Sequence, residues 1–310
     1  MEKWRDNEGE NKTRDQYHFW ILRRIIMTEK CIYCGMEIEG KGIIKKIDDE
    51  DIKFCSRHCA VMFDGLEKKG RMKAAIMAER NAIIEDIEKE RGTRVITMIH
   101  RREPWEEKDD SQINIEDTEH VLMRIRQTPE DVDLMLHTPG GFVLASEMIA
   151  MAVKNHPAKV TVIIPFYAMS GGTLIALAAN EIMMEKDSVL GPVDPQLGGF
   201  PAGALISLPE KKPVETISDD YIMLSEEARK SLIRVQKMVM WLLEDKMDKE
   251  NAEELAEFLT GGYMTHDMPI VFDVAKSFGL NVKQGIPKKI YELIRTFEFG
   301  ACSRPQSAKY

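Results

Sequence analysis

The sequence contains no run of 18 or more apolar residues, so no segment is long enough to cross a bilayer as a helix. Its first residues, MEKWRDNEGENKTRDQ, lack the basic start and apolar segment of a secretory signal, and we therefore expect a cytoplasmic protein. Cysteine is scarce, and five cysteines among 310 residues exclude a disulfide-dense secreted scaffold. There is no excess of basic residues either, because the net charge is −9.

The excess of acidic over basic residues is confined to one part of the chain. Residues 1–75 contain 16 Lys and Arg against 14 Asp and Glu, whereas the remainder contains 27 against 38. An acidic body repels phosphate backbones, so nucleic-acid binding is not expected after residue 75 and stays open before it. The content of 44% hydrophobic and 31% charged residues is typical of globular proteins, and the length suggests about two folded units.

Composition and motifs divide the chain into five segments. A polar and potentially disordered extension comes first, and Met27 stands directly before the motif TEKCIYCG, which leaves open that Met27 is the true start. A small unit with two cysteine pairs follows, and apolar residues spaced by four and seven then predict a linker helix. The boundaries are 1–26 for the extension, 27–65 for the cysteine unit, 66–91 for the helix, 92–298 for the main domain and 299–310 for a tail.

After Gly92 the pattern changes to strands that alternate with helices. Such alternation predicts an α/β fold with a mostly parallel sheet and right-handed crossovers. The stretch LGPVDPQLGGFPAG, rich in Pro and Gly, predicts a shaped loop. We expect strands at 94–100, 131–138, 159–167 and 181–187, and helices at 115–127, 143–155, 173–180, 224–247, 251–259, 269–278 and 288–296.

Two glycine-containing turns follow apolar strands of this predicted sheet. The first is HTPGG after the strand DLML, and the second is MSGG after VTVIIPFYA. In a parallel sheet, ligands bind at the carboxyl ends of the strands, so both turns are expected at the same functional edge. Ser170 would stand where a strand passes into a helix, and the backbone N–H groups of Gly141 and Gly171 could converge on a developing oxyanion.

These positions suit acyl transfer, with Ser170 as the nucleophile. Gly140, Phe142 and Gly172 flank the three residues of the predicted site, and we expect them to contact the substrate. The alternative is that both segments are ordinary turns and that Ser170 is a helix cap.

The combined motifs resemble a known family. HTPGG, FYAMSGGTLIALAANEI, LGPVDPQLG and MTHDMPI are similar to the serine dehydrogenase proteinase family, a branch of the ClpP/crotonase superfamily related to signal peptide peptidase A. The resemblance covers roughly residues 90–290. It implies a β-β-α superhelical fold, serine peptidase activity on peptide or protein substrates, and a homo-oligomer. It assigns Ser170 as nucleophile, with Gly141 and Gly171 forming the oxyanion hole.

The general base departs from one family pattern. ClpP-type relatives carry a histidine about one strand and turn after the nucleophile, but SVLGPVDPQ contains none. Signal peptide peptidases and a class of archaeal peptidases use a Ser-Lys dyad, and Lys212 or Lys211 would supply such a lysine. Solvated loop lysines are the alternative for this pair. His137 and His266 are open as bases, with structural roles as the alternative, and Asp194 could orient a base or cap a loop.

The cysteine spacing predicts a metal site. Cys31-x2-Cys34 and Cys55-x3-Cys59 offer four thiolates, which suits structural zinc because four protein ligands leave no open position. The pattern YCGMEI…FCSRHCAVMF is similar to treble-clef zinc modules, and His58 is an alternative fourth ligand. We expect the module to bind a partner, with protein and nucleic acid both open.

The sequence thus predicts a serine endopeptidase with an N-terminal zinc module. Two other functions stay open. One is a non-catalytic oligomeric scaffold, and the other is a crotonase-like acyl-CoA enzyme, whose oxyanion hole would suit a thioester enolate.

Overall fold

The protein divides into two compact units, Met1–Met77 and Ala78–Tyr310. No helix in the described residues combines the length and the apolar composition that a membrane span requires. The predicted tail lies outside the described part of the chain, as does all of the N-terminal extension except two short strands. The computed structural model describes residues 4–5, 11–12, 30–31, 34, 36–38, 42–47, 50–101, 103, 112–262 and 264–297.

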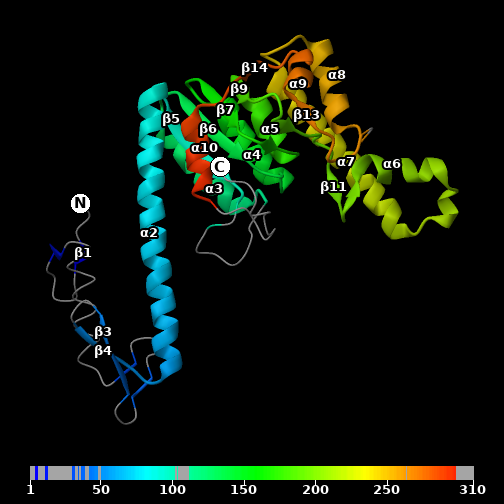
Figure 1. The fold of residues 1–310 in the computed structure, drawn as a ribbon. Helices are drawn as coiled ribbons and strands as arrows, with labels where there is room; N and C mark the ends of the chain where they lie inside the picture. Colours follow the sequence, from blue (N-terminus) through cyan, green and yellow to red (C-terminus); the bar gives the residue numbers. More distant parts are fainter. Residues whose placement is uncertain are drawn as a thin grey trace, which may run out of the picture. The chain divides into compact units, whose positions relative to one another are not determined.

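The first unit contains two antiparallel strand pairs and the start of a long helix (Figure 1). Its buried core consists of Cys31, Ile52, Phe54, Cys59 and Ala60. The strands are β1 (Trp4–Arg5), β2 (Asn11–Lys12), β3 (Ile43–Ile47) and β4 (Glu50–Phe54).

Helix α2 (Arg57–Arg91) begins earlier than the predicted linker helix at residue 66. The reason is local, because the Ser56 hydroxyl accepts a hydrogen bond from the Cys59 N–H at 3.2 Å and so caps the first turn. The second cysteine pair therefore stands at the start of this helix, and α2 continues from the first unit into the second.

The second unit is built on a five-stranded parallel sheet with the order β14-β9-β7-β6-β5. Its central strands are near-continuous apolar runs, as expected when both faces of a sheet are covered. A second, three-stranded sheet has the order β13-β10-β8. The strands are β5 (Arg94–Ile99), β6 (Val132–His137), β7 (Val160–Ile164), β8 (Tyr167–Ala168), β9 (Glu181–Met184), β10 (Val189–Leu190), β13 (Ile270–Val271) and β14 (Val282–Gln284).

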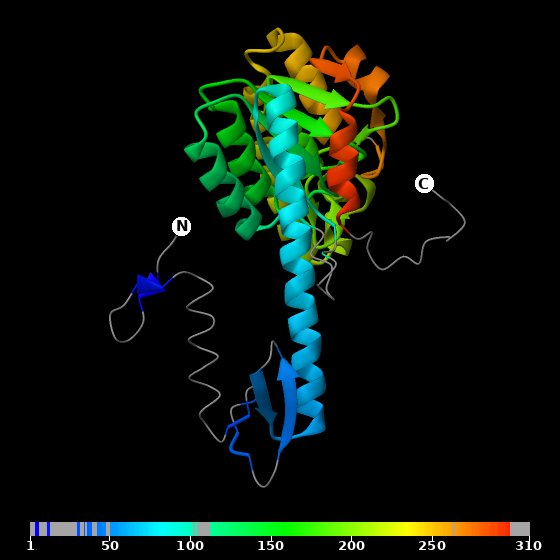
Figure 2. The ribbon, with the colours of Figure 1, turned by 60° about the vertical axis from the view of Figure 1, so that its left-hand side comes forward.

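Side chains alternate between the two faces of the sheet. Leu134 and Leu136 of β6 join the larger core, which also contains residues from most of the helices, whereas Met135 joins a smaller core with Ile87 of α2 and Ile290 of α10. Figures 1 and 2 show the end of α2 and α10 side by side. The helices are α3 (Ile115–Gln127), α4 (Val143–Lys154), α5 (Gly171–Ala178), α7 (Asp219–Leu243), α8 (Lys249–Thr260), α9 (Phe272–Ser277) and α10 (Lys288–Arg295).

One helix was not expected. The predicted loop at 190–203 contains a small hairpin, β11 (Gln196–Leu197) and β12 (Phe200–Pro201), and then leads into α6 (Ala202–Lys211). Gly and Pro punctuate this stretch, and Pro209 even lies inside the helix, so local propensity argues against it. Packing stabilises α6, because Ala202 and Leu205 are buried with Ala228 of α7.

Candidate functional site

The two glycine turns lie side by side at the carboxyl ends of β6 and β8. Thr138, directly after β6, joins them: its N–H donates to the Tyr167 carbonyl at 3.2 Å, and its carbonyl accepts from the Met169 N–H at 2.9 Å. Each turn leads directly into a helix, the first into α4 and the second into α5. Parallel pairing of β6 with β7 therefore brings two segments about thirty residues apart into hydrogen-bonding contact.

Ser170 has an unusual backbone conformation. It is the N-terminal cap residue of α5, with φ 50° and ψ −115°, and no other non-glycine residue in the described part of the chain has a positive φ. Its side chain makes no capping hydrogen bond, so the helix-cap alternative finds no support here. A strained backbone of this kind costs about 1–3 kcal/mol and is typical of functional positions.

Two positions around Ser170 require glycine because neighbouring atoms occupy the space that a side chain would need. Gly140 has φ +101°, and a Cβ added there would lie 2.8 Å from both the Met169 carbonyl oxygen and the Ser170 Cβ. A Cβ on Gly171 would overlap the Ser146 hydroxyl. A side chain at Gly140 would thus force the two turns apart, and one at Gly171 would collide with Ser146 of α4.

The Gly140–Gly141 peptide is oriented by backbone hydrogen bonds between Ile113 and the residues of the turn. Ile113 donates its N–H to the Gly140 carbonyl at 2.8 Å and accepts from the Phe142 N–H at 2.9 Å. A trans peptide directs its N–H opposite to its C=O, so the Gly141 N–H points away from Ile113. Within the described part of the chain, neither the Gly141 N–H nor the Gly171 N–H has an acceptor. Both donors are therefore available to a ligand.

A cavity of about 380 Å³ opens at these turns. Its lining combines apolar side chains with the polar groups that could take part in chemistry. The lining residues are Gln112, Pro139, Gly140, Gly141, Phe142, Val143, Ser146, Ser170, Gly171, Leu174, Val193, Asp194, Pro195, Gln196, Val235 and His266.

A histidine-carboxylate pair lies in this cavity. His266 Nδ1 is 2.5 Å from Asp194 Oδ1, and Gln196 Nε2 donates to Asp194 Oδ2 at 2.8 Å. The Asp194 side chain is 1% exposed and that of His266 is 39% exposed. The hydrogen bond to Asp194 raises the pKa of His266 against the opposing effect of burial. Because Nδ1 is engaged, Nε2 is the atom of His266 that remains to exchange a proton.

Comparisons with known proteins identify the family. Residues 61–310 match the family model described as ClpP-like SDH-type serine proteinase. The chain belongs to this family. Two proteins of Methanocaldococcus jannaschii, the uncharacterized proteins MJ1495 and MJ0137, are 47% and 45% identical to it over 231 and 224 residues. The matches cover 73% and 71% of this chain and 78% of each relative.

Among solved structures, a membrane-bound stomatin-specific protease aligns with a TM-score of 0.41 and 18% identity, covering 65% of this chain and 82% of that protein. ClpP1 from Listeria monocytogenes aligns with a TM-score of 0.41 and 15% identity, covering 64% and 96%. The family match confirms the expected resemblance and, with the parallel sheet and its flanking helices, the ClpP-like α/β fold class.

In this member of the ClpP-like family, neither of the two predicted base lysines is among the residues that line the cavity. Lys211 is the last residue of α6 and Lys212 caps it, and both side chains are exposed. His137 is buried in β6, where its Nε2 accepts from Arg101 at 3.1 Å, and it does not line the cavity either. Of the expected substrate-contacting residues, Gly140 and Phe142 line the cavity, whereas Gly172 packs against Thr138.

The pairing of Asp194 with His266 is the main feature that the sequence left open. The two residues are 72 positions apart, and no spacing rule relates them. The signal available was their occurrence in LGPVDPQLG and MTHDMPI, two of the motifs that carry the family resemblance. Only the fold, through the antiparallel pairing of β10 with β13, brings together the strand before Asp194 and the strand after His266.

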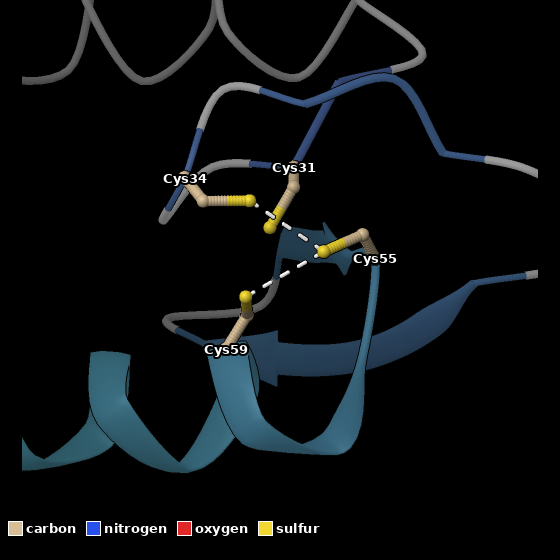
Figure 3. Close-up of side chains that lie close together, drawn as sticks. All are labelled: Cys31, Cys34, Cys55 and Cys59. Atoms are coloured by element: carbon tan, nitrogen blue, oxygen red, sulfur yellow. Dashed lines mark hydrogen bonds between the residues drawn. The ribbon is translucent and has the colours of Figure 1, made fainter.

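The four cysteines of the first unit form a separate cluster, shown in Figure 3. Their sulfur atoms all lie within 4.8 Å of one another, and Cys55 Sγ is 3.5 Å from the Sγ atoms of both Cys34 and Cys59. Four sulfurs bound tetrahedrally to zinc at about 2.3 Å would lie about 3.8 Å apart. The cluster therefore fits a metal ion, and among the described residues His58 does not belong to it.

Proposed function

We propose that this protein is a serine endopeptidase in which Ser170 is the nucleophile and His266, oriented by Asp194, is the general base. The observation that carries the proposal is the strained Ser170 backbone in the same cavity as the His266–Asp194 pair. A hydroxyl nucleophile needs an adjacent base, and a base needs a group that orients it.

The reaction would proceed in two steps. Ser170 Oγ forms a bond to the substrate carbonyl carbon as the C=O π bond opens, and the Oγ proton passes to His266 Nε2. The N–H groups of Gly141 and Gly171 stabilise the oxyanion, and His266 returns the proton to the departing amine as the C–N bond breaks. Water then hydrolyses the acyl-enzyme by the same path.

The cavity also suggests the class of substrate. Its apolar lining residues Val143, Leu174, Val193 and Val235 suit an apolar side chain next to the scissile bond. We place Gly140 and Phe142 at the entrance, beside the peptide backbone of the substrate. Gly172, packed on Thr138, would support the turn.

The identity of the base decides the first experiment. Labelling with a fluorophosphonate serine-hydrolase probe would compare wild type with Ser170→Ala, His266→Ala, Lys211→Ala and Lys212→Ala. We expect loss of labelling for the first two and normal labelling for the lysine variants. His120→Ala is the matched control, because His120 is an exposed histidine on α3.

Each contrary result has a definite meaning. Loss of labelling only in Lys212→Ala or Lys211→Ala would replace His266 by a Ser-Lys dyad. Labelling that persists in Ser170→Ala would reject Ser170 as the nucleophile. Absence of labelling in all folded variants would favour the scaffold function.

No cavity observation favours the acyl-CoA alternative. Among the described residues that line the cavity there is no Lys or Arg to bind the phosphates of CoA. Calorimetric titration with CoA tests this directly, and binding would revive the alternative.

We also propose that the four cysteines bind structural zinc and that the protein acts in the cytoplasm as a homo-oligomer. The support for zinc is the all-sulfur donor set at tetrahedral spacing. Light scattering coupled to size-exclusion chromatography measures the assembly, and a monomer at working concentrations would contradict it. A protein partner for the zinc module is tested by crosslinking with the full chain.

A further inference from the structure

A second aspartate-histidine-hydroxyl array lies directly behind the Gly140–Gly141 turn. His100 Nδ1 is 2.7 Å from Thr138 Oγ1, and His100 Nε2 is 3.2 Å from Asp117 Oδ2. The Thr138 hydroxyl in turn accepts a hydrogen bond from the Gly140 N–H at 3.1 Å. The array therefore ends on the backbone of the turn that presents the Gly141 N–H.

The direction of each hydrogen bond follows from the available protons. The Asp117 carboxylate can only accept, so His100 Nε2 carries a proton and donates it. Nδ1 of the neutral ring then accepts from the Thr138 O–H, and the lone pairs of Thr138 Oγ1 are free for the Gly140 N–H. The Nε2–H tautomer of His100 thus gives both ring nitrogens and the Thr138 hydroxyl a hydrogen-bond partner.

The same carboxylate also holds the other side of the turn. Asp117 Oδ2 accepts from the Asn114 N–H at 2.9 Å at the start of α3. The neighbouring residue, Ile113, donates its N–H to the Gly140 carbonyl at 2.8 Å. The Gly140 N–H and C=O groups are therefore both connected to Asp117, one through His100 and Thr138 and the other through Ile113.

Thr138 and His100 cannot reach a substrate themselves. Thr138 is fully buried, His100 is 8% exposed, and neither lines the cavity at Ser170. A direct chemical role is excluded by this burial. What remains is control over the orientation of the peptide that carries the Gly141 N–H.

We propose that Asp117, His100 and Thr138 are positioning residues that hold the Gly140–Gly141 peptide in the orientation required for oxyanion stabilisation. This inference rests on the proposed reaction at Ser170. An oxyanion donor contributes fully only when it is preorganised, and a displacement of about 1 Å can cost about 10²-fold in rate. Loss of the Thr138 hydroxyl frees the Gly140 N–H and leaves the turn held on one side only.

The test compares Thr138→Val with Thr138→Ser in the full-length, zinc-loaded protein, using a fluorogenic peptide with an apolar residue before the cleaved bond. We expect Thr138→Val to lower kcat by about 10- to 100-fold with KM within about twofold, and Thr138→Ser to restore most of the rate. Thr161→Val is the matched control, because Thr161 is a buried threonine of the same sheet, in β7. The control should retain the wild-type kcat.

Inhibitor affinity gives a readout that a merely structural role would not move. Ser170 Oγ adds to the carbonyl carbon of a peptide aldehyde, and the Oγ proton passes to the base. The former carbonyl oxygen then lies in the oxyanion hole. The matching peptide alcohol binds without this bond. We expect Thr138→Val to weaken the aldehyde by at least tenfold and leave the alcohol unchanged.

Equal weakening of both inhibitors, or a Thr138→Val rate equal to that of Thr161→Val, would overturn the positioning role. Failure of the proposed function is seen separately, in the Ser170→Ala variant. If Ser170→Ala cleaved the peptide at the wild-type rate, both the reaction and the positioning role at this turn would be rejected.

Discussion

At the scale of single residues, two histidines have pKa values that are shifted in opposite directions. His266 is half-exposed and bonded to a buried carboxylate, which raises its pKa. His137 is 2% exposed, has no hydrogen-bond partner for Nδ1 among the described residues, and has its pKa lowered to about 3, chiefly by burial. The first arrangement suits a group that gains and loses a proton during turnover, and the second keeps the ring neutral.

The pH dependence of catalysis should report on His266. A base must be neutral to accept a proton, so the acid limb of kcat/KM should have its midpoint above 6.5, the ordinary pKa of histidine. In Asp194→Asn the carboxylate no longer stabilises the imidazolium, so the midpoint should fall and kcat should drop by about 10²-fold or more. Steady-state rates between pH 5 and 9 measure both; an unchanged midpoint in Asp194→Asn would contradict the pairing.

The pH dependence of stability should report on His137. In the unfolded chain the His137 side chain binds a proton below about pH 6.5, whereas in the folded protein it does so only near pH 3. The stability due to neutral His137 is therefore present above pH 6.5 and lost as pH falls, by up to about 1.4 kcal/mol per pH unit. Urea unfolding of wild type and His137→Phe should give a steeper acid loss in wild type, and parallel curves would disprove it.

At the scale of elements, the site depends on how closely two turns approach. A Cβ at position 141 would overlap the backbone of Ile113. This backbone is held in place because α3 begins directly afterwards, at Ile115. Space elsewhere is ample: nothing lies within 4 Å of a Cβ added at Gly70 in the middle of α2.

Alanine at these two glycines should therefore act in opposite ways. Gly141→Ala should displace the turn and lower kcat by about 10²-fold, which peptide turnover measures. Gly70→Ala should stabilise α2 by about 0.5–1 kcal/mol without a change in kcat, as followed by thermal unfolding. Normal turnover in Gly141→Ala would show that the close contact with Ile113 is not needed.

At the scale of the whole molecule, the two units have separate cores of very different size. The first unit buries five apolar side chains, and two of them belong to the cluster of four cysteines. A core this small rarely folds without a metal or disulfides, whereas the second unit buries two apolar layers around a five-stranded sheet.

Metal removal should accordingly affect one unit only. We expect calorimetry of the full chain to show two transitions, of which chelation with EDTA or the change Cys59→Ser removes the smaller. The larger transition should keep its midpoint to within a few degrees. Metal analysis should find one zinc per chain in wild type, and a single transition that disappears entirely on chelation would contradict independent units.

Much of this architecture was predictable because it depends on local patterns. The helix predicted at 115–127 is α3 as observed, since its cap and apolar spacing lie within thirteen residues. The strands of the parallel sheet follow from short apolar runs, and the cysteine cluster from its two spacings. Helix α6 was missed because Gly203 and Pro209 oppose it locally, and only burial against α7 stabilises it.

By itself the sequence determined the family, most of the helices and the main strands, the two glycine turns with Ser170, and the four clustered cysteines, because each depends on neighbours in the chain or on motifs that can be matched directly. The tertiary structure alone decided that His266 meets Asp194 across 72 residues and that Lys211 and Lys212 lie exposed at the end of α6. It also decided that His100 reaches Thr138 beside the Gly140–Gly141 turn. Such contacts are set by how strands and helices pack, and no periodicity or spacing within the chain encodes them.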